Sequence, residues 1–191
     1  MIARFYYDLN SPYAYLAASR VDGLVPEPVE WMPIALGPLL VAQGRVPWSL
    51  TPGDREAGIR ECERRAAERG LPPIRWPEGW PDATYSVNGA RAALVGERHG
   101  RQREVALAIF EQVFVHGGAL DDPAVLDAAG AAAGVDGLRD AVADPAVKQE
   151  LRDRTEAARE RGVVGVPTVE TGGKLFWGDD RLEDAAAAVA A

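Results

Sequence analysis

A serine at the expected start of a helix is the first residue whose position could support chemistry. Residues 2–7 are rich in aromatic and β-forming types and predict a buried strand, which is followed by a turn. Ser11 would then be the N-cap of the next helix, with Pro12 at the first helical position. A hydroxyl there can donate a hydrogen bond to a bound thiolate, and the helix dipole stabilises the same negative charge. The alternative is that Ser11 only caps the helix.

Two segments near the end of the chain also carry groups that could bind a ligand. Val166 and Pro167 precede a predicted strand, which a trans proline could simply open. Asp179 and Asp180 stand at the predicted start of the last helix. Backbone N–H groups at a helix start can bind a carboxylate, and an aspartate side chain can pair with an ammonium group. Both aspartates could equally be simple helix caps.

Aromatic side chains gather in and near a long segment without periodicity, residues 71–81. Trp76 and Trp80 lie in this segment, and together with Trp48 and Tyr85 they could line an apolar pocket for an aromatic substrate. Aromatic residues in loops also fill hydrophobic cores, so both interpretations stay open. Long loops in compact domains are often functional.

The composition narrows the class of protein. The chain has 21 Lys and Arg against 29 Asp and Glu, and this net charge of −8 argues against a nucleic-acid partner. The interleaved charges between Arg55 and Arg69 indicate a solvated helix face. One cysteine, Cys62, and two histidines exclude an internal disulfide and argue against a metal site. Because no run approaches about 18 apolar residues and no signal peptide is recognisable, we expect a cytoplasmic protein without membrane contact.

The predicted elements follow in a definite order. The strand, helix and strand of residues 2–34 form a unit of the kind that builds a parallel pair of strands. Residues 36–162 show helical periodicity broken by Pro and Gly, without a convincing strand. Residues 168–171 and 174–177 then predict a hairpin around a Gly-Gly pair, and a final helix follows.

Three blocks of this sequence resemble one protein family. They are FYYDLNSPYAYL from Phe5, GVVGVPT from Gly162 and LFWGDDRL from Leu175. In this order they resemble the signature blocks of the 2-hydroxychromene-2-carboxylate isomerases, which belong with the kappa-class glutathione transferases in the DsbA-like branch of the thioredoxin superfamily. The resemblance covers nearly the whole chain. It implies an α/β, thioredoxin-like (DsbA-type) fold, with a thioredoxin-like domain of residues 1–35 and 163–191 and a large helical insertion, residues 36–162.

The same resemblance implies a glutathione site. Ser11 stands where redox members of the superfamily carry a nucleophilic cysteine, so it would activate the glutathione sulfur without being the nucleophile. Pro167 would be the cis-proline that faces this helix start, and the backbone of Val166 would pair with the glutathione peptide. Asp180, with Asp179 as the weaker candidate, would bind the ammonium of the γ-glutamyl group.

One position departs from the family pattern. After Gly44 the family usually carries an asparagine that helps to build the site, whereas this chain has Arg45. Arg45 could hold a carboxylate of the substrate or of glutathione through two hydrogen bonds, or it could point to solvent. Together with Trp76 and Trp80 it is the predicted substrate contact.

The implied function is a glutathione-dependent cis–trans isomerase of the 2-hydroxychromene-2-carboxylate type. It would act on a small aromatic substrate in aromatic catabolism and form a homodimer. One alternative is a kappa-like glutathione transferase or peroxidase, which would consume glutathione, and another is a thiol-binding module without turnover. A disulfide oxidoreductase is rejected because Ser11 and Ala14 occupy the two cysteine positions of the redox motif, and Cys62 is expected to be buried far from them.

Overall fold

The computed structural model describes residues 2–82, 84 and 87–189. Its elements are, in chain order, β1 (Ala3–Tyr7), α1 (Pro12–Ala18), α2 (Val21–Leu24), β2 (Val29–Pro33), α3 (Leu36–Ala42), the 3-10 helix η1 (Trp48–Leu50), α4 (Pro52–Glu68), α5 (Asn88–Arg98), α6 (Gln102–Phe114), α7 (Pro123–Ala133), α8 (Leu138–Ala141), α9 (Pro145–Glu160), β3 (Thr168–Thr171), β4 (Lys174–Trp177), the 3-10 helix η2 (Asp179–Arg181) and α10 (Leu182–Val189). Tyr85, one of the predicted pocket residues, lies outside the described residues.

The four strands form one mixed sheet in the order β2-β1-β3-β4. β1 and β2 pair in parallel, as the strand–helix–strand pattern predicts, whereas β3 is antiparallel to both β1 and β4. Gly172 and Gly173 join β3 to β4 with φ angles of +56° and +73°, the left-handed backbone that a two-residue hairpin turn of this kind needs. The predicted strands and hairpin are confirmed, and β1 begins at Ala3, one residue later than expected.

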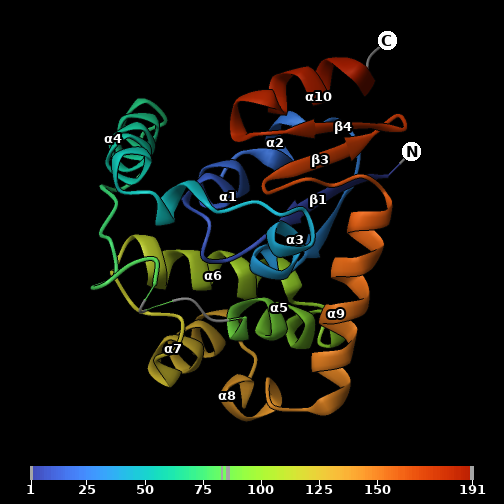
Figure 1. The fold of residues 1–191 in the computed structure, drawn as a ribbon. Helices are drawn as coiled ribbons and strands as arrows, with labels where there is room; N and C mark the ends of the chain where they lie inside the picture. Colours follow the sequence, from blue (N-terminus) through green and yellow to red (C-terminus); the bar gives the residue numbers. More distant parts are fainter. Residues whose placement is uncertain (1, 83, 85–86, 190–191) are drawn as a thin grey trace.

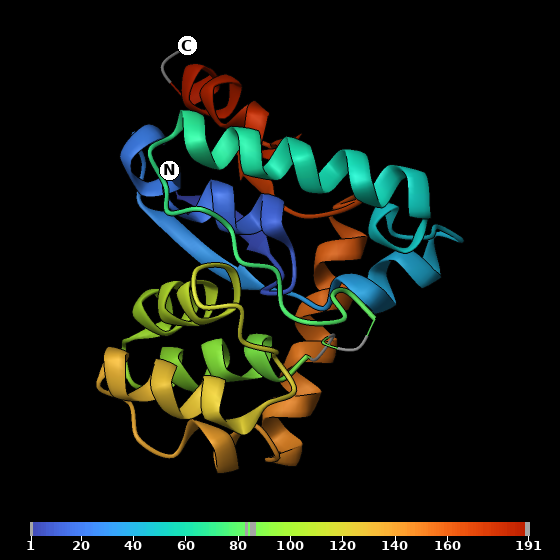
Figure 2. The same ribbon diagram turned by 90° about the vertical axis from the view of Figure 1, so that its left-hand side faces the viewer.

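Helices make up the rest of the described chain. Within the described parts of residues 36–162 every regular element is helical, as predicted. Figures 1 and 2 show α10 on one side of the molecule, beyond β3 and β4, and α5 to α8 gathered on the opposite side. The long helix α4 packs against α1, and α9 packs against both α3 and β2. None of the helices that the structure describes has the length and apolar character that crossing a membrane would demand.

One continuous hydrophobic cluster joins the sheet to the helices. It contains Phe5 and Tyr7 of β1, Leu16 of α1, Leu94 of α5 and Phe110 of α6, each at most 1% exposed. The rings of Phe5 and Tyr7 stack with their centroids 5.4 Å apart. β1, the strand that leads into the Ser11 turn, is therefore held in place by its packing in this core.

Candidate functional site

The topology brings three distant segments to one end of the sheet. Tyr6 of β1 pairs with Thr168 of β3, and Thr168 pairs in turn with Trp177 of β4. Because β3 is antiparallel to its neighbours, the residues after β1, before β3 and after β4 all leave the sheet at the same end. These are the segments that contain Ser11, Val166-Pro167 and Asp179-Asp180.

Ser11 is the N-cap of α1, as predicted, with Pro12 at the first helical position. Its side-chain oxygen accepts a hydrogen bond of 3.2 Å from the N–H of Ala14, and the residue is only 7% exposed. The hydroxyl proton is not used in that contact, so it can be donated to an anion placed at the helix start. The capping role of Ser11 is thus confirmed, and its role as a hydrogen-bond donor to a bound thiolate stays a prediction.

Asp8 lies behind this turn and was not singled out from the sequence. Its two carboxylate oxygens accept hydrogen bonds from the N–H groups of Asn10, at 2.8 Å, and of Leu36, at 2.7 Å. Burial raises the pKa of the Asp8 carboxyl, and the two backbone hydrogen bonds oppose that rise. Its carboxylate ties the Ser11 turn to the start of α3. The Asp-x-Asn spacing, typical of a turn held by an aspartate side chain, was the available sequence signal.

The segment before β3 faces the site with unpaired backbone. The Val166–Pro167 peptide bond is cis, the isomer that the family resemblance implies. Thr168 donates its hydroxyl to the carbonyl of Gly165, at 2.7 Å, and so holds the turn closed. Within the described residues, neither the N–H nor the C=O of Val166 has a hydrogen-bond partner. An extended peptide could therefore add to Val166 as a short strand.

The two aspartates after β4 have different surroundings, although both lie close to Pro167. The N–H of Gly178 donates to the carbonyl of Pro167 at 2.9 Å and places the start of η2 beside the cis-proline turn. Asp179 is 1% exposed and forms ion pairs with Arg65, at 2.6 Å, and with Arg69. The Asp180 side chain is 59% exposed. Only Asp180 is accessible to a ligand without opening internal ion pairs.

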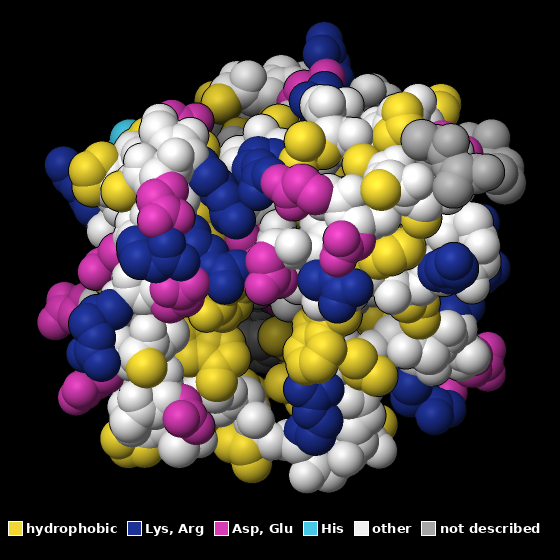
Figure 3. All heavy atoms as spheres, turned by 90° about the horizontal axis from the view of Figure 1, so that it is seen from above, with side chains coloured by type: hydrophobic (Ala, Val, Ile, Leu, Met, Phe, Trp, Pro, Cys, Tyr) yellow, Lys and Arg dark blue, Asp and Glu magenta, His cyan; other side chains and the backbone are white. Residues whose placement is uncertain are grey.

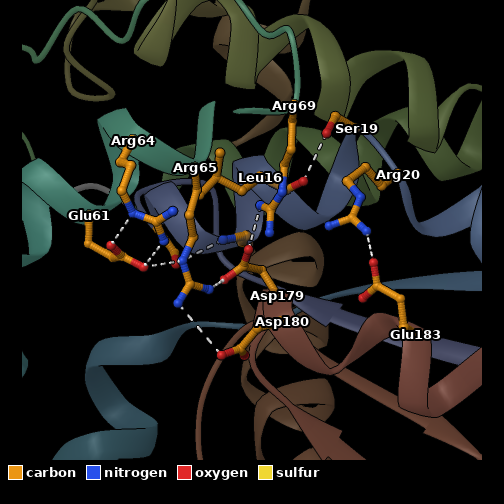
Figure 4. A network of polar contacts seen from close by, with 12 residues as sticks. Leu16, Ser19, Arg20, Glu61, Arg64, Arg65, Arg69, Asp179, Asp180 and Glu183 are labelled. Carbon is orange, nitrogen blue, oxygen red and sulfur yellow. Dashed lines mark hydrogen bonds and ion pairs between the residues drawn. The ribbon is translucent and has the colours of Figure 1, made fainter. Parts of the chain in front are cut away.

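The arginines that hold Asp179 correct one prediction. The charged stretch of α4 was expected to be a solvated face, yet the Arg65 and Arg69 side chains are only 19% and 16% exposed. Figure 4 shows both guanidinium groups directed at Asp179, with Arg65 reaching toward Asp180 as well. The expectation is confirmed for Arg60 and Arg64, whose side chains are 69% and 53% exposed. It is wrong for Arg65 and Arg69, because their charged partner, Asp179, lies more than a hundred residues away in the sequence.

Three of the predicted aromatic residues form one chain of rings with Tyr13. The ring of Tyr13, two residues after Ser11, meets Trp48 edge-on at 5.7 Å between centroids, and Trp48 lies 5.7 Å from Trp80. Trp80 is 4.6 Å from Trp76. Trp80 is buried, whereas Trp48 and Trp76 are half-buried. The chain of rings leads away from the start of α1, so it can serve both as core and as one wall of a site.

Arg45 contacts the cis-proline segment instead of pointing freely into solvent. Its guanidinium donates to the carbonyl of Val164, at 2.5 Å, and lies 5.0 Å from the ring centroid of Trp177. Gly165 is also required at this point, because a Cβ there would lie 2.7 Å from the Trp177 indole nitrogen. Arg45 and Trp177 therefore brace the loop that presents Val166.

Cys62 is buried, as expected, but it is not far from the Ser11 turn. It lies on the side of α4 that packs against α1, close to the side chain of Tyr13. Burial raises the pKa of the Cys62 thiol to about 12, so the thiol stays protonated near neutral pH. Its surroundings make it a structural residue.

Known proteins are similar to this chain in sequence. The family model of the DSBA-like thioredoxin domain matches residues 3–190. The chain is 27% identical over 192 residues to the 2-hydroxychromene-2-carboxylate isomerase of Sphingobium xenophagum, covering 94% of this chain and 93% of that protein. It is 26% identical over 196 residues to the Pseudomonas putida protein of the same name, covering 95% and 91%.

A solved structure of a 2-hydroxychromene-2-carboxylate isomerase is also similar, with a TM-score of 0.87 and 25% identity over 100% of this chain and 95% of that one. The α/β, thioredoxin-like (DsbA-type) fold expected from the sequence is confirmed, as is the resemblance to these isomerases. By the match over residues 3–190, the chain belongs to the DSBA-like thioredoxin domain family.

Proposed function

We propose that this protein is a glutathione-dependent isomerase of the 2-hydroxychromene-2-carboxylate type that acts in aromatic catabolism. The observation that carries the proposal is the unpaired backbone of Val166 at the same end of the sheet as the Ser11 hydroxyl. The similarity to isomerases over more than 90% of the chain supports the reaction class.

The residues at this end of the sheet fit a bound glutathione. Val166 would donate its N–H and accept through its C=O, pairing with the cysteinyl part of the peptide. Ser11 would donate a hydrogen bond from its hydroxyl to the thiolate sulfur, and the N-terminus of α1 would lower the pKa of the thiol further. Asp180 would pair with the ammonium of the γ-glutamyl group.

When bound, glutathione would supply a thiolate that adds to a carbon–carbon double bond of the substrate. That bond would be single while the sulfur is attached, so it could rotate before the thiolate leaves unchanged. The chain itself would keep that sulfur ionised through Ser11 and hold the reacting groups together. Trp76 and Trp80 would line the substrate side of the site, and Arg45 would brace the Val166 loop while its remaining N–H groups stay available to a substrate carboxylate.

A titration of reduced glutathione tests this proposal. Heat of binding and the ultraviolet absorbance of the bound thiolate are followed for the unsubstituted protein, Ser11→Ala and Ser19→Ala. Ser19 is the matched control because it caps the other end of α1, where its hydroxyl donates to the carbonyl of Leu16. We expect Ser11→Ala to lose the thiolate signal and to isomerise 2-hydroxychromene-2-carboxylate about 100-fold more slowly, while Ser19→Ala keeps both. Absence of glutathione binding to the unsubstituted protein would refute the proposal.

Stoichiometry separates the two catalytic alternatives. An isomerase leaves the concentration of reduced glutathione constant through many turnovers, whereas a kappa-like transferase or peroxidase consumes it. Binding without turnover of any aromatic substrate would indicate a thiol-binding module. We further propose a cytoplasmic homodimer, as the family resemblance implies, and sedimentation of the purified protein tests the oligomeric state.

A further inference from the structure

The residues that would hold the ligand are themselves buried. Ser11 and Val166 are each 7% exposed, so little of either is open to a peptide of the size of glutathione. On the face shown in Figure 3, a hollow is bordered by hydrophobic side chains, and acidic and basic side chains gather beside it. One of the elements around Ser11 therefore has to move before a peptide can lie along both residues.

Two of the segments next to the site are fixed to the interior. α3 begins with two backbone N–H groups that donate to Thr155 of α9, at 3.0 Å, and to the buried Asp8. The loop before β3 is held closed by Thr168 and braced by Arg45. Neither segment can swing outward without breaking contacts with the interior of the molecule.

The helix α4, which also lies next to the site, has little contact with the interior. All 17 of its residues are described, and Cys62 and Ala66 alone are buried among them. In α6, by contrast, seven of the 13 residues are buried. Figures 1 and 2 show α4 on the outside of the molecule, beside α1. A helix with so small an apolar contact detaches more easily than the helices of the core.

Polar contacts hold α4 in place instead. Arg65 and Arg69 form ion pairs with the buried Asp179, and Glu63 accepts a hydrogen bond of 2.8 Å from the indole N–H of Trp76. Water can replace each partner when the helix moves outward, so these contacts can break and form again. The two arginines join α4 to η2, which in turn contacts α1.

Resting on the site proposed for glutathione, we infer that α4 is a lid over the start of α1. It opens as a unit by breaking its ion pairs with Asp179, admits the thiol peptide to Ser11 and Val166, and closes again over the bound peptide. Closing returns the guanidinium of Arg65 to the ring of Tyr13, 5.6 Å from its centroid and two residues from Ser11. The closed lid separates the ligand from water during the reaction.

Cys62 reports on this opening. It is the one cysteine of the chain, it is buried, and it lies on the side of α4 that packs against α1, so iodoacetamide reaches it only when α4 leaves α1. The rate of alkylation is measured by mass spectrometry at low urea concentrations for the unsubstituted protein, Arg69→Gln and Arg64→Gln. Arg64 is the matched control, because its side chain is 53% exposed and pairs with Glu61 and Glu68 of α4 itself.

We expect the alkylation rate of the unsubstituted protein to depend on urea less than about a third as steeply as global unfolding does, because opening α4 exposes only part of the buried surface. Arg69→Gln should speed the reaction about 10-fold or more, since it leaves the buried Asp179 with one ion pair fewer in the closed state. Arg64→Gln should stay within about 2-fold, as expected for an exposed ion pair.

Alkylation with the full urea dependence of global unfolding would overturn the inference, since Cys62 would then be reached only in the unfolded chain. A rate for Arg69→Gln no higher than that for Arg64→Gln would overturn it as well. Saturating reduced glutathione should slow hydrogen exchange of the α4 amides about 10-fold, and unchanged exchange in a complex that calorimetry shows to form would also contradict the lid. If glutathione does not bind, the proposed function fails, and the alkylation rates still decide whether α4 opens.

Discussion

Asp8 shows how a single buried carboxylate can set the shape of a functional turn. It is 4% exposed, and it accepts one backbone N–H on each oxygen, from Asn10 in the turn and from Leu36 at the start of α3. The carbonyl of Asp8 in addition accepts the N–H of Ser11, at 3.1 Å. The position of the Ser11 hydroxyl therefore depends on a residue that is itself buried.

The buried Asp8 carboxyl should make stability depend on pH. Its pKa is raised by burial, so the folded chain binds this proton more tightly than the unfolded chain. Its contribution to the free energy of unfolding is then most favourable below the ordinary aspartate pKa of about 4, and it is lost as the pH rises through the higher folded pKa. We expect the Asp8→Asn variant, whose side chain stays neutral, to gain stability relative to the unsubstituted protein from about pH 4 to pH 7. Urea unfolding at several pH values measures this, and a pH-independent difference would contradict it.

For single residues, the sequence predicted the place in a helix or turn better than it predicted the contacts with distant side chains. Ser11 and Pro12 lie where their local pattern places them, because capping involves only residues within one turn. The two aspartates lie in η2, directly before α10, and neither is the N-cap of η2, which is Gly178. That Asp179 is buried and Asp180 is exposed could not be predicted, since the difference comes from Arg65 and Arg69 on a distant helix.

The helix α4 positions the first tryptophan of the ring chain through a glycine. The ring of Trp48 lies directly on Gly58, so closely that a Cβ at this position would overlap with the ring. Gly53 belongs to the same helix, and a Cβ there would meet nothing within 4 Å. Gly58 therefore allows α4 to pack closely against Trp48 of η1, whereas Gly53 makes no such contact.

These two glycines should respond in opposite ways to alanine. Gly53→Ala removes only backbone freedom, so we expect unchanged stability or a gain of up to about 1 kcal/mol. Gly58→Ala forces Trp48 to shift, and we expect a loss of about 1–2 kcal/mol after the gain in helix propensity is subtracted. Urea unfolding gives both values, and the tryptophan fluorescence of the folded Gly58→Ala variant should change. Equal effects of the two substitutions would show that Trp48 is not held by this contact.

The end of α1 is a boundary that the sequence did not predict. The helix expected from Pro12 to about Val21 instead ends at Ala18, and the short α2 begins at Val21. Ser19 ends α1 by donating its hydroxyl to the carbonyl of Leu16, a contact that competes with the helix backbone. Neither Ser19 nor Arg20 is a strong helix breaker, which is why the break was not predicted.

At the scale of the whole molecule, the sheet and the helices share their buried interior. The large cluster and a smaller one, which contains Tyr6 of β1, Leu39 of α3 and Ala158 of α9, both join strand and helix residues. The large cluster includes Phe5 of the sheet and Leu94 and Phe110 of the helices, so neither part has a separate apolar interior. The β1–β2 and β3–β4 pairings could be predicted from the parallel unit and the hairpin, which are local patterns, whereas the pairing of β1 with β3 joins distant parts of the chain and could not. The packing of α4 to α9 could not, because the sequence shows which face of a helix is apolar but not which neighbour covers it.

A shared core predicts cooperative unfolding. We expect Leu94→Ala, which creates a cavity in α5, to lower the free energy of unfolding of the whole chain by about 2–5 kcal/mol. Far-ultraviolet circular dichroism and tryptophan fluorescence should report the same single transition in urea for both proteins. Two separate transitions, with only one of them shifted by the substitution, would show that the helices unfold independently of the sheet.

The rings of Tyr13, Trp48, Trp80 and Trp76 come from α1, from η1 and from the segment after α4, and successive rings are no more than 5.7 Å apart. Neighbouring indoles in a fixed asymmetric arrangement couple their electronic transitions. The near-ultraviolet circular dichroism spectrum of this protein therefore shows whether these three segments are assembled around the start of α1. It reports on the architecture of the site without a label.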